Sequence, residues 1–423
     1  MPTEIKGKRL WIPYMSETST VLAAVLRACG IDAQVLERSP DPALSLAREV
    51  IHGDVCIPML YTTEDMLYRA TRKDFSSEKE AFFQGRAEGP YRYGMYYMLQ
   101  KILLDRIHKN VDIVSVNTTN ASSGLGIGTL LLVFDALIAH DQLEKMLHHT
   151  RPYEINKGET ERVFHKYVGV LCNEVLKPKY RWNPGIDYVK VASGLHLESL
   201  EELLHSASGE FEKISKHNKA LPHIGLVGEF FVRCHFPSNQ DIIRKVEALG
   251  GEVWLAPATE FLTYANYISG YFAGKNWKDL GKFDALLGKV QCNILNLLAI
   301  REEHHLFSAT LPYMKGFDDI PAGTLVEYGS IYMSKDFGGE AICSLGKSED
   351  FARRGLKGVI SVIPFNCMPG MVVAAISREI RRNHQNIPFL TVDHDEFTDA
   401  TKDQQLAIFM SQVNDRLKLR NRL

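Results

Sequence analysis

The sequence predicts an α/β protein with two doubly wound, mostly parallel-sheet lobes, a helical insert and a cleft between the lobes. Strand patterns alternate with helical patterns in residues 1–128 and again in residues 222–423, and this alternation implies parallel sheets. Helical periodicity dominates residues 129–221, which lie between these two parts. A length of 423 residues also exceeds what one hydrophobic core usually organises.

The first lobe, residues 1–128, begins with a strand at 9–14 and a helix at 18–29 that ends on Gly30, a favourable C-terminal stop. A second strand follows at 33–36. The remaining pattern predicts helices at 42–51, 59–70 and 93–107, a weak strand at 81–83 and a strand at 111–116. These elements form successive βα units.

The helical bridge, residues 129–221, contains predicted helices at 130–148, 159–176 and 196–217. The second lobe, residues 222–423, has predicted strands at 224–231, 252–255, 358–364 and 388–392. Helices are expected at 239–249, 279–303, 370–382 and 402–416. In doubly wound sheets ligands bind beyond the carboxyl ends of the strands, so the loops that follow the strands are where a site is expected.

Composition and charge exclude several classes of protein. A net charge of -2 argues against a nucleic-acid partner. The longest apolar run, residues 130–139, falls short of the ~20 residues that cross a bilayer, so no membrane segment is predicted. The N-terminus, MPTEIKGKRLW, lacks the apolar region of a secretion signal, and we expect a cytoplasmic protein.

The seven cysteines are spread singly, without a C-x-x-C pair, so a metal site has to assemble from distant segments. Two of these cysteines occur in similar sequence contexts. Cys56 in GDVCIP and Cys367 in PFNCMPG each precede a predicted helix, where the first backbone N–H groups favour a thiolate and hence a metal ligand. The alternative interpretation is two packed thiols.

Three other features of the sequence are weaker indications of a binding or metal site. The loop 89–96, GPYRYGMY, enters a helix and carries Arg92, which could face an anionic group. The glycine-rich run GLGIG at 124–128 is similar to a phosphate loop but lacks the Lys-Ser/Thr that follows in such loops. A nucleotide-binding enzyme that uses this run is one alternative function. The adjacent pairs His148-His149 and His304-His305 point about 100° apart on a helix and do not suit one ion.

Several short motifs occur in the order found in one family. They are the run around Cys56, GPYRYG at 89–94, RPYE at 151–154, GLVGE at 225–229, LGGEV at 249–253, GEA at 339–341 ahead of GK at 346–347, and FNCMP at 365–369. On these motifs the chain resembles, along nearly its whole length, the activase-related family allied to 2-hydroxyacyl-CoA dehydratases. The similarity is to the C-terminal module of CoA-substrate-specific enzyme activases and to the dehydratase subunits.

The resemblance implies an iron-sulfur cluster, of the 4Fe-4S type or larger, held in the cleft by cysteines from separated loops. Cys56 and Cys367 match two ligand positions. The third falls on Tyr91, where the family has a cysteine, and a phenolate is a harder ligand than the thiolates that suit such clusters. Cys234 is an alternative third ligand. Arg92 is expected to hold an anionic substrate group or to balance the charge of the cluster.

The function implied by the resemblance is that of a dehydratase (lyase) or reductase component that receives low-potential electrons from an ATP-dependent activase under anaerobic conditions. Its substrate would be a CoA ester or another small molecule, and dimers are typical of the family. The sequence assigns no catalytic residue and shows no ATPase motifs, so the chain is not expected to be the activase itself. Tyr91 leaves three alternatives open: an unusual or external third ligand, a labile cluster, or a cluster-free binding or scaffolding module.

Overall fold

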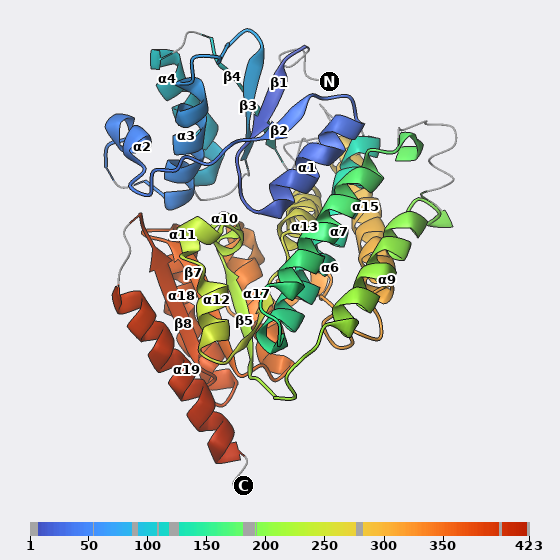
Figure 1. The fold of residues 1–423 in the computed structure, drawn as a ribbon, viewed down its shortest axis with the longest axis vertical. Helices are drawn as coiled ribbons and strands as arrows, with labels where there is room; N and C mark the ends of the chain where they lie inside the picture. Colours follow the sequence, from blue (N-terminus) through green and yellow to red (C-terminus); the bar gives the residue numbers. More distant parts are fainter. Residues whose placement is uncertain are drawn as a thin grey trace.

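A computed structural model describes residues 7–53, 55–86, 92–107, 110–117, 127–180, 191, 193–275, 282–396 and 400–420. It contains two four-stranded, all-parallel sheets flanked by helices, as the sequence predicts. Figure 1 shows one lobe above the other, with a layer of long helices running beside both.

The first sheet has the strand order β2-β1-β3-β4. Its strands are β1 (Arg9–Ile12), β2 (Ala33–Val35), β3 (Glu80–Arg86) and β4 (Asp112–Asn117). Its helices are α1 (Glu17–Ala28), α2 (Ser45–Val50), α3 (Ile57–Ala70) and α4 (Tyr96–Ile107), the last preceded by the 3₁₀ turn η2 (Arg92–Met95). The strand predicted as three residues at 81–83 is therefore a seven-residue inner strand with partners on both sides.

The second sheet repeats this arrangement in the order β6-β5-β7-β8. Its strands are β5 (His223–Gly228), β6 (Glu252–Leu255), β7 (Gly358–Pro364) and β8 (Phe389–His394). Its helices are α10 (Phe230–Cys234), α11 (Phe236–Asn239), α12 (Ile242–Ala248), α16 (Ala322–Gly329), α17 (Ala341–Arg353), α18 (Met368–Asn383) and α19 (Ala400–Arg420), with the 3₁₀ turn η5 (Lys335–Phe337).

The helical layer is built around α6, which is largely buried. Its members are α6 (Ile127–Thr150), α7 (Glu159–Val175), α9 (Glu198–Lys213), α13 (Thr259–Lys275) and α15 (Lys282–Ser308), with the 3₁₀ turns η3 (Arg151–Tyr153) and η4 (Pro178–Tyr180). Helix α1 of the first lobe also packs on α6. Because α13 and α15 come from the segment after β6, parts of the chain far apart in sequence share this layer.

Close packing fixes the point where β5 ends. A Cβ on Gly228, which has φ +129, would lie 2.0 Å from the carbonyl oxygen of Val362 on β7, so only glycine fits there. The strand therefore ends three residues before the predicted position. The next residue, Glu229, accepts a hydrogen bond from Val232 N–H and begins α10. This turn places the Glu229 side chain at the carboxyl edge of the second sheet.

The two lobes are joined through α3. Ile57 belongs to the apolar core of the second lobe, and Tyr61 packs against that core from the same helix. The Tyr61 hydroxyl also donates to the Pro237 carbonyl at 3.3 Å. Figure 1 shows α3 directly above α10 and α11. Within the parts of the chain that the structure describes, no helix has both the length and the apolar character needed to cross a membrane.

Candidate functional site

Two cysteines occupy equivalent places in the two lobes. Cys56 is the N-cap residue of α3 and Cys367 is the N-cap residue of α18, and each helix has a proline in its first turn. Proline is favoured there because its missing N–H needs no partner and its φ suits a helix. In both cases the thiol sits beside the N–H groups of a first helical turn, which favour negative charge.

The fold brings these two cysteines together. The charge of Cys56 contributes to the raised pKa of Cys367, and the charges of both cysteines contribute to the raised pKa of Tyr96. Arg92 links their surroundings, because its Nη2 donates to the carbonyl of Asn366 at 3.1 Å and its guanidinium also contacts the Cys56 thiol. The Tyr96 hydroxyl contacts the Cys56 thiol as well.

Both thiols are buried and electrically neutral in the absence of a cation. Burial raises the pKa of Cys56, while Tyr96 and Arg92 act in the opposite direction. Burial also raises the pKa of Cys367, and the Glu340 and Glu229 carboxyls add to this effect. A metal cation reverses such a shift because it binds the deprotonated sulfur directly.

Two buried carboxyl groups complete the centre. Burial raises the pKa of Glu229 to about 7, although the backbone N–H groups of Val232 and Phe231 oppose the shift. Burial, and next the charge of Glu229, hold the pKa of Glu340 well above its usual value. The Glu340 Oε2 has no hydrogen-bond donor among the described residues. The pair therefore retains at least one proton near neutral pH.

A buried cation lies behind these carboxyls. Arg233 on α10 contacts Glu260 at 3.2 Å and donates to the Pro257 carbonyl at 2.8 Å. Its charge lowers the pKa of both Glu229 and Glu340 against the effect of burial. We refer to Cys56, Arg92, Tyr96, Glu229, Glu340 and Cys367 as the inter-lobe centre.

The other predicted ligand positions are placed differently. Tyr91 lies outside the described residues, so its position relative to the thiols is not defined. Cys234 is fully buried on α10, and its acidic neighbours Glu144 and Asp141 belong to α6. Its thiol therefore faces the helical layer. The Gly124–Gly126 part of the glycine-rich loop also lies outside the described residues.

A large apolar cavity of about 370 Å³ adjoins the inter-lobe centre. Tyr96 and Pro58 line it on the side of Cys56, and Arg86 lines it at the end of β3. The opposite walls come from α6, α13 and α15, with side chains such as Phe134, Phe261 and Leu298. A cavity of this size and character is typical of sites that bind small organic molecules.

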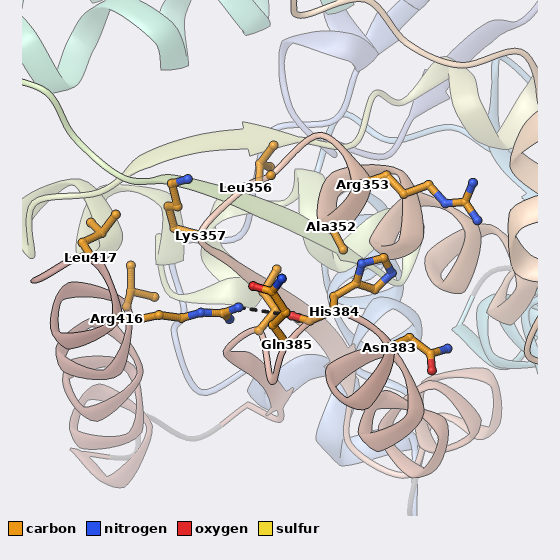
Figure 2. A pocket seen from close by; sticks show the side chains of 12 residues that line it. Ala352, Arg353, Leu356, Lys357, Asn383, His384, Gln385, Arg416 and Leu417 are labelled. Carbon is orange, nitrogen blue, oxygen red and sulfur yellow. Dashed lines mark hydrogen bonds between the residues drawn. The ribbon is translucent and has the colours of Figure 1, made fainter. Parts of the chain in front are cut away.

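A second depression, of about 260 Å³, lies at the other end of the second lobe. Figure 2 shows it between the ends of α17, α18 and α19, where Arg416 donates to the His384 carbonyl at 3.2 Å. Leu356 and Lys357 line it just before β7 begins. Because it sits at the amino ends of the strands, it lies opposite the edge where doubly wound sheets bind ligands.

The donor set of the inter-lobe centre fits part of an iron-sulfur cluster site. Two thiols from opposite lobes converge, and Arg92 and Tyr96 provide hydrogen-bond donors near sulfur. The sequence alone had indicated Cys56, Cys367 and Arg92, whereas Tyr96 and the pairing of Glu229 with Glu340 became apparent only in the fold. No protein-family model matches the chain, and no curated protein matches it.

Proposed function

We propose that this chain is an iron-sulfur protein of the 2-hydroxyacyl-CoA dehydratase or reductase type, which accepts low-potential electrons from a separate ATP-dependent activase. The observation that carries the proposal is the convergence of Cys56 and Cys367 at the starts of two helices from opposite lobes. Such thiols suit iron-sulfur ligation. A cytoplasmic location and a dimeric state belong to the same proposal.

The described residues have distinct roles in this proposal. Cys56 and Cys367 would hold the cluster, which supplies low-potential one-electron transfer when bound. Arg92 and Tyr96 would orient and polarise the Cys56 sulfur. Glu229, whose pKa is raised to about 7, could protonate a leaving hydroxyl group near neutral pH.

The apolar cavity would hold the acyl part of the substrate. Its wall includes Tyr96, which also contacts Cys56, so a molecule in the cavity would lie next to the inter-lobe centre. Arg86 and Arg92 lie on the same side of the first lobe and could bind an anionic group of a CoA ester or another small substrate. These positions support a molecule with an apolar chain and an anionic group as the substrate class.

The second candidate function is that of a cluster-free binding or scaffolding module with the same fold. Tyr91 favours it, because a phenol stands where the family resemblance calls for a thiol. The raised pKa of both cysteine thiols agrees with two neutral, packed side chains. In this function the apolar cavity would bind a small molecule without redox chemistry.

The first test is to measure iron and acid-labile sulfide per chain, with the visible spectrum, on protein purified without oxygen. We expect near-stoichiometric iron and sulfide, and a broad visible band that bleaches on reduction. Cys56→Ser and Cys367→Ser should each lose most of the iron. Cys172→Ser is the matched control, because Cys172 packs against the core of the helical layer, and it should keep the iron.

Two outcomes would support the cluster-free function instead. One is the absence of iron even after anaerobic reconstitution. The other is a stable cluster in Tyr91→Cys where the natural protein has none, which would mean that the third ligand has been lost. Equal iron contents in Cys56→Ser, Cys367→Ser and Cys172→Ser would place the metal elsewhere.

A further inference from the structure

Three metal-ligating side chains meet in the helical layer, away from the inter-lobe centre. Asp135 comes from α6, Glu302 from α15, and His196 from the turn that precedes α9. The His196 Nε2 lies 3.4 Å from Asp135 Oδ2 and 3.3 Å from Glu302 Oε1. One ligand atom from each residue lies within 4.8 Å of the other two, so a single ion could contact all three.

The burial of these groups calls for a counter-charge. Asp135 is 2% exposed and Glu302 is 0% exposed. Asp135 Oδ1 and Glu302 Oε2 each lack a hydrogen-bond donor among the described residues. Arg301 contacts Glu302 Oε1 at 3.2 Å, but the same nitrogen donates to the Val191 carbonyl at 2.7 Å. Burial and the neighbouring Glu302 raise the pKa of Asp135. Two such buried carboxyl groups beside one shared cation need either a bound cation or a shared proton to offset the cost of burying their charge.

We propose that Asp135, His196 and Glu302 bind one divalent transition-metal ion. One imidazole nitrogen and two carboxylate oxygens form a donor set typical of Zn²⁺, Fe²⁺ and Mn²⁺. The three residues come from three separate segments that pack together only in the folded chain. No short sequence motif contains all three, so the sequence alone does not indicate the site. The competing explanation is that the two carboxyl groups share a proton in place of an ion.

The site lies beside the apolar cavity. Glu302 lines the cavity, together with Phe134 next to Asp135 on α6 and Ala299 one turn before Glu302 on α15. With three protein ligands, a four- or five-coordinate ion keeps one or two positions for other donors. Water molecules would occupy them. The proposal is independent of the iron-sulfur function, because it uses none of the residues of the inter-lobe centre.

The test is a calorimetric Zn²⁺ titration of the full chain after removal of metal with a chelator. We expect one tight site in the natural protein, with affinity at least about 100-fold weaker in Asp135→Asn and Glu302→Gln, the upper end of the loss seen even for outer-shell changes. Glu201→Gln is the matched control. Glu201 on α9 pairs with His305 on α15 at 3.2 Å. Among the described residues no third metal-ligating side chain converges on that pair, so binding should be unchanged.

Zn²⁺ also binds thiols, so the same titration is run on the Cys56→Ser/Cys367→Ser double variant. This variant should keep the tight site if the ion binds at Asp135, His196 and Glu302. Loss of the site in the double variant, no tight site in the natural protein, or equal affinity in Asp135→Asn and Glu201→Gln would each overturn the proposal. Far-ultraviolet circular dichroism checks folding, and His196→Gln replaces any carboxylate variant that fails to fold.

Discussion

Glu229 shows how burial can adapt one side chain to acid-base chemistry. Its pKa is raised to about 7 from 4.5 because the folded chain removes the carboxyl from water. Its titratable and charged neighbours are Glu340, Arg233, Cys56, Cys367, Tyr93 and Tyr96. A carboxyl group with this pKa can both give and take a proton near neutral pH.

The raised pKa of Glu229 predicts a pH-dependent change in stability. The folded chain holds this proton more tightly than the unfolded chain, so its contribution is fully present below pH 4.5 and is lost as the pH rises through about 7. Glu229→Gln cannot ionise and still offers an oxygen to Val232 N–H. We expect it to be more stable than the natural protein by about 3 kcal/mol at pH 8 and by less than about 0.5 kcal/mol at pH 4.5.

Urea unfolding at the two pH values measures this difference. Glu379→Gln on α18 is the control, because the Glu379 side chain is half-exposed and pairs with Arg382 at the surface, and it should show no gain in stability at pH 8. A stability difference of the same size at pH 4.5 and pH 8 would contradict the raised pKa and point to a change in packing alone.

At the residue scale, the sequence predicted part of the candidate site. Cys56 and Cys367 could be singled out because each precedes a proline-containing helix start, which is a local pattern. Tyr96 could not be separated from the other tyrosines, since its contact with Cys56 depends on how α4 packs beside α3. The same holds for Glu340, whose partner Glu229 is distant in sequence.

At the element scale, a buried aspartate fixes the start of α13. Asp141 on α6 accepts hydrogen bonds from Ala258 N–H at 3.2 Å, Thr259 N–H at 2.9 Å and the Thr259 hydroxyl at 2.5 Å. It therefore caps a helix to which it does not belong. This contact orients α13 against α6, and both helices form walls of the apolar cavity.

Removing this buried cap should lower the free energy of unfolding more than removing an exposed helix cap. Asp141→Ala leaves three buried donors without a partner, and we expect a loss of about 2–3 kcal/mol in the free energy of unfolding at pH 7. Asp41→Ala is the comparison. The Asp41 carboxylate accepts hydrogen bonds from Ala43 N–H and Ser45 N–H at the exposed start of α2. Its removal should lower the free energy of unfolding much less, because water can accept hydrogen bonds from these two N–H groups. Equal losses in chemical denaturation would show that Asp141 does not act as a buried cap.

Most strands and helices could be predicted from the sequence, and the errors have physical causes. Strand β3 was predicted too short because Gln84, Gly85 and Arg86 look unlike strand residues, yet they pair with β4. Helix α13 was not predicted, because its threonine, tyrosine and phenylalanine residues favour strands by local propensity. Packing against α15 and the cap from Asp141 override that propensity.

At the scale of the whole molecule, α3 decides how the lobes meet. Its first residue, Ile57, is 2% exposed and lies in the apolar core of the second lobe, although α3 follows β2 of the first lobe. Cys56 immediately precedes it. Any opening of the lobes that withdraws Ile57 from this core therefore also carries the Cys56 thiol away from Cys367.

Ile57→Ala should consequently weaken both lobes together. We expect a loss of about 2–4 kcal/mol, typical of a buried isoleucine truncated to alanine, with faster amide hydrogen exchange in α3 and also in α10 of the second lobe. Ile51→Ala is the matched control, because Ile51 is 4% exposed but packs only within a core cluster of the first lobe. It should lose similar stability while exchange in α10 stays unchanged. Unchanged exchange in α10 in both variants would mean that the lobes open independently of α3, and the pairing of the two thiols would then need another explanation.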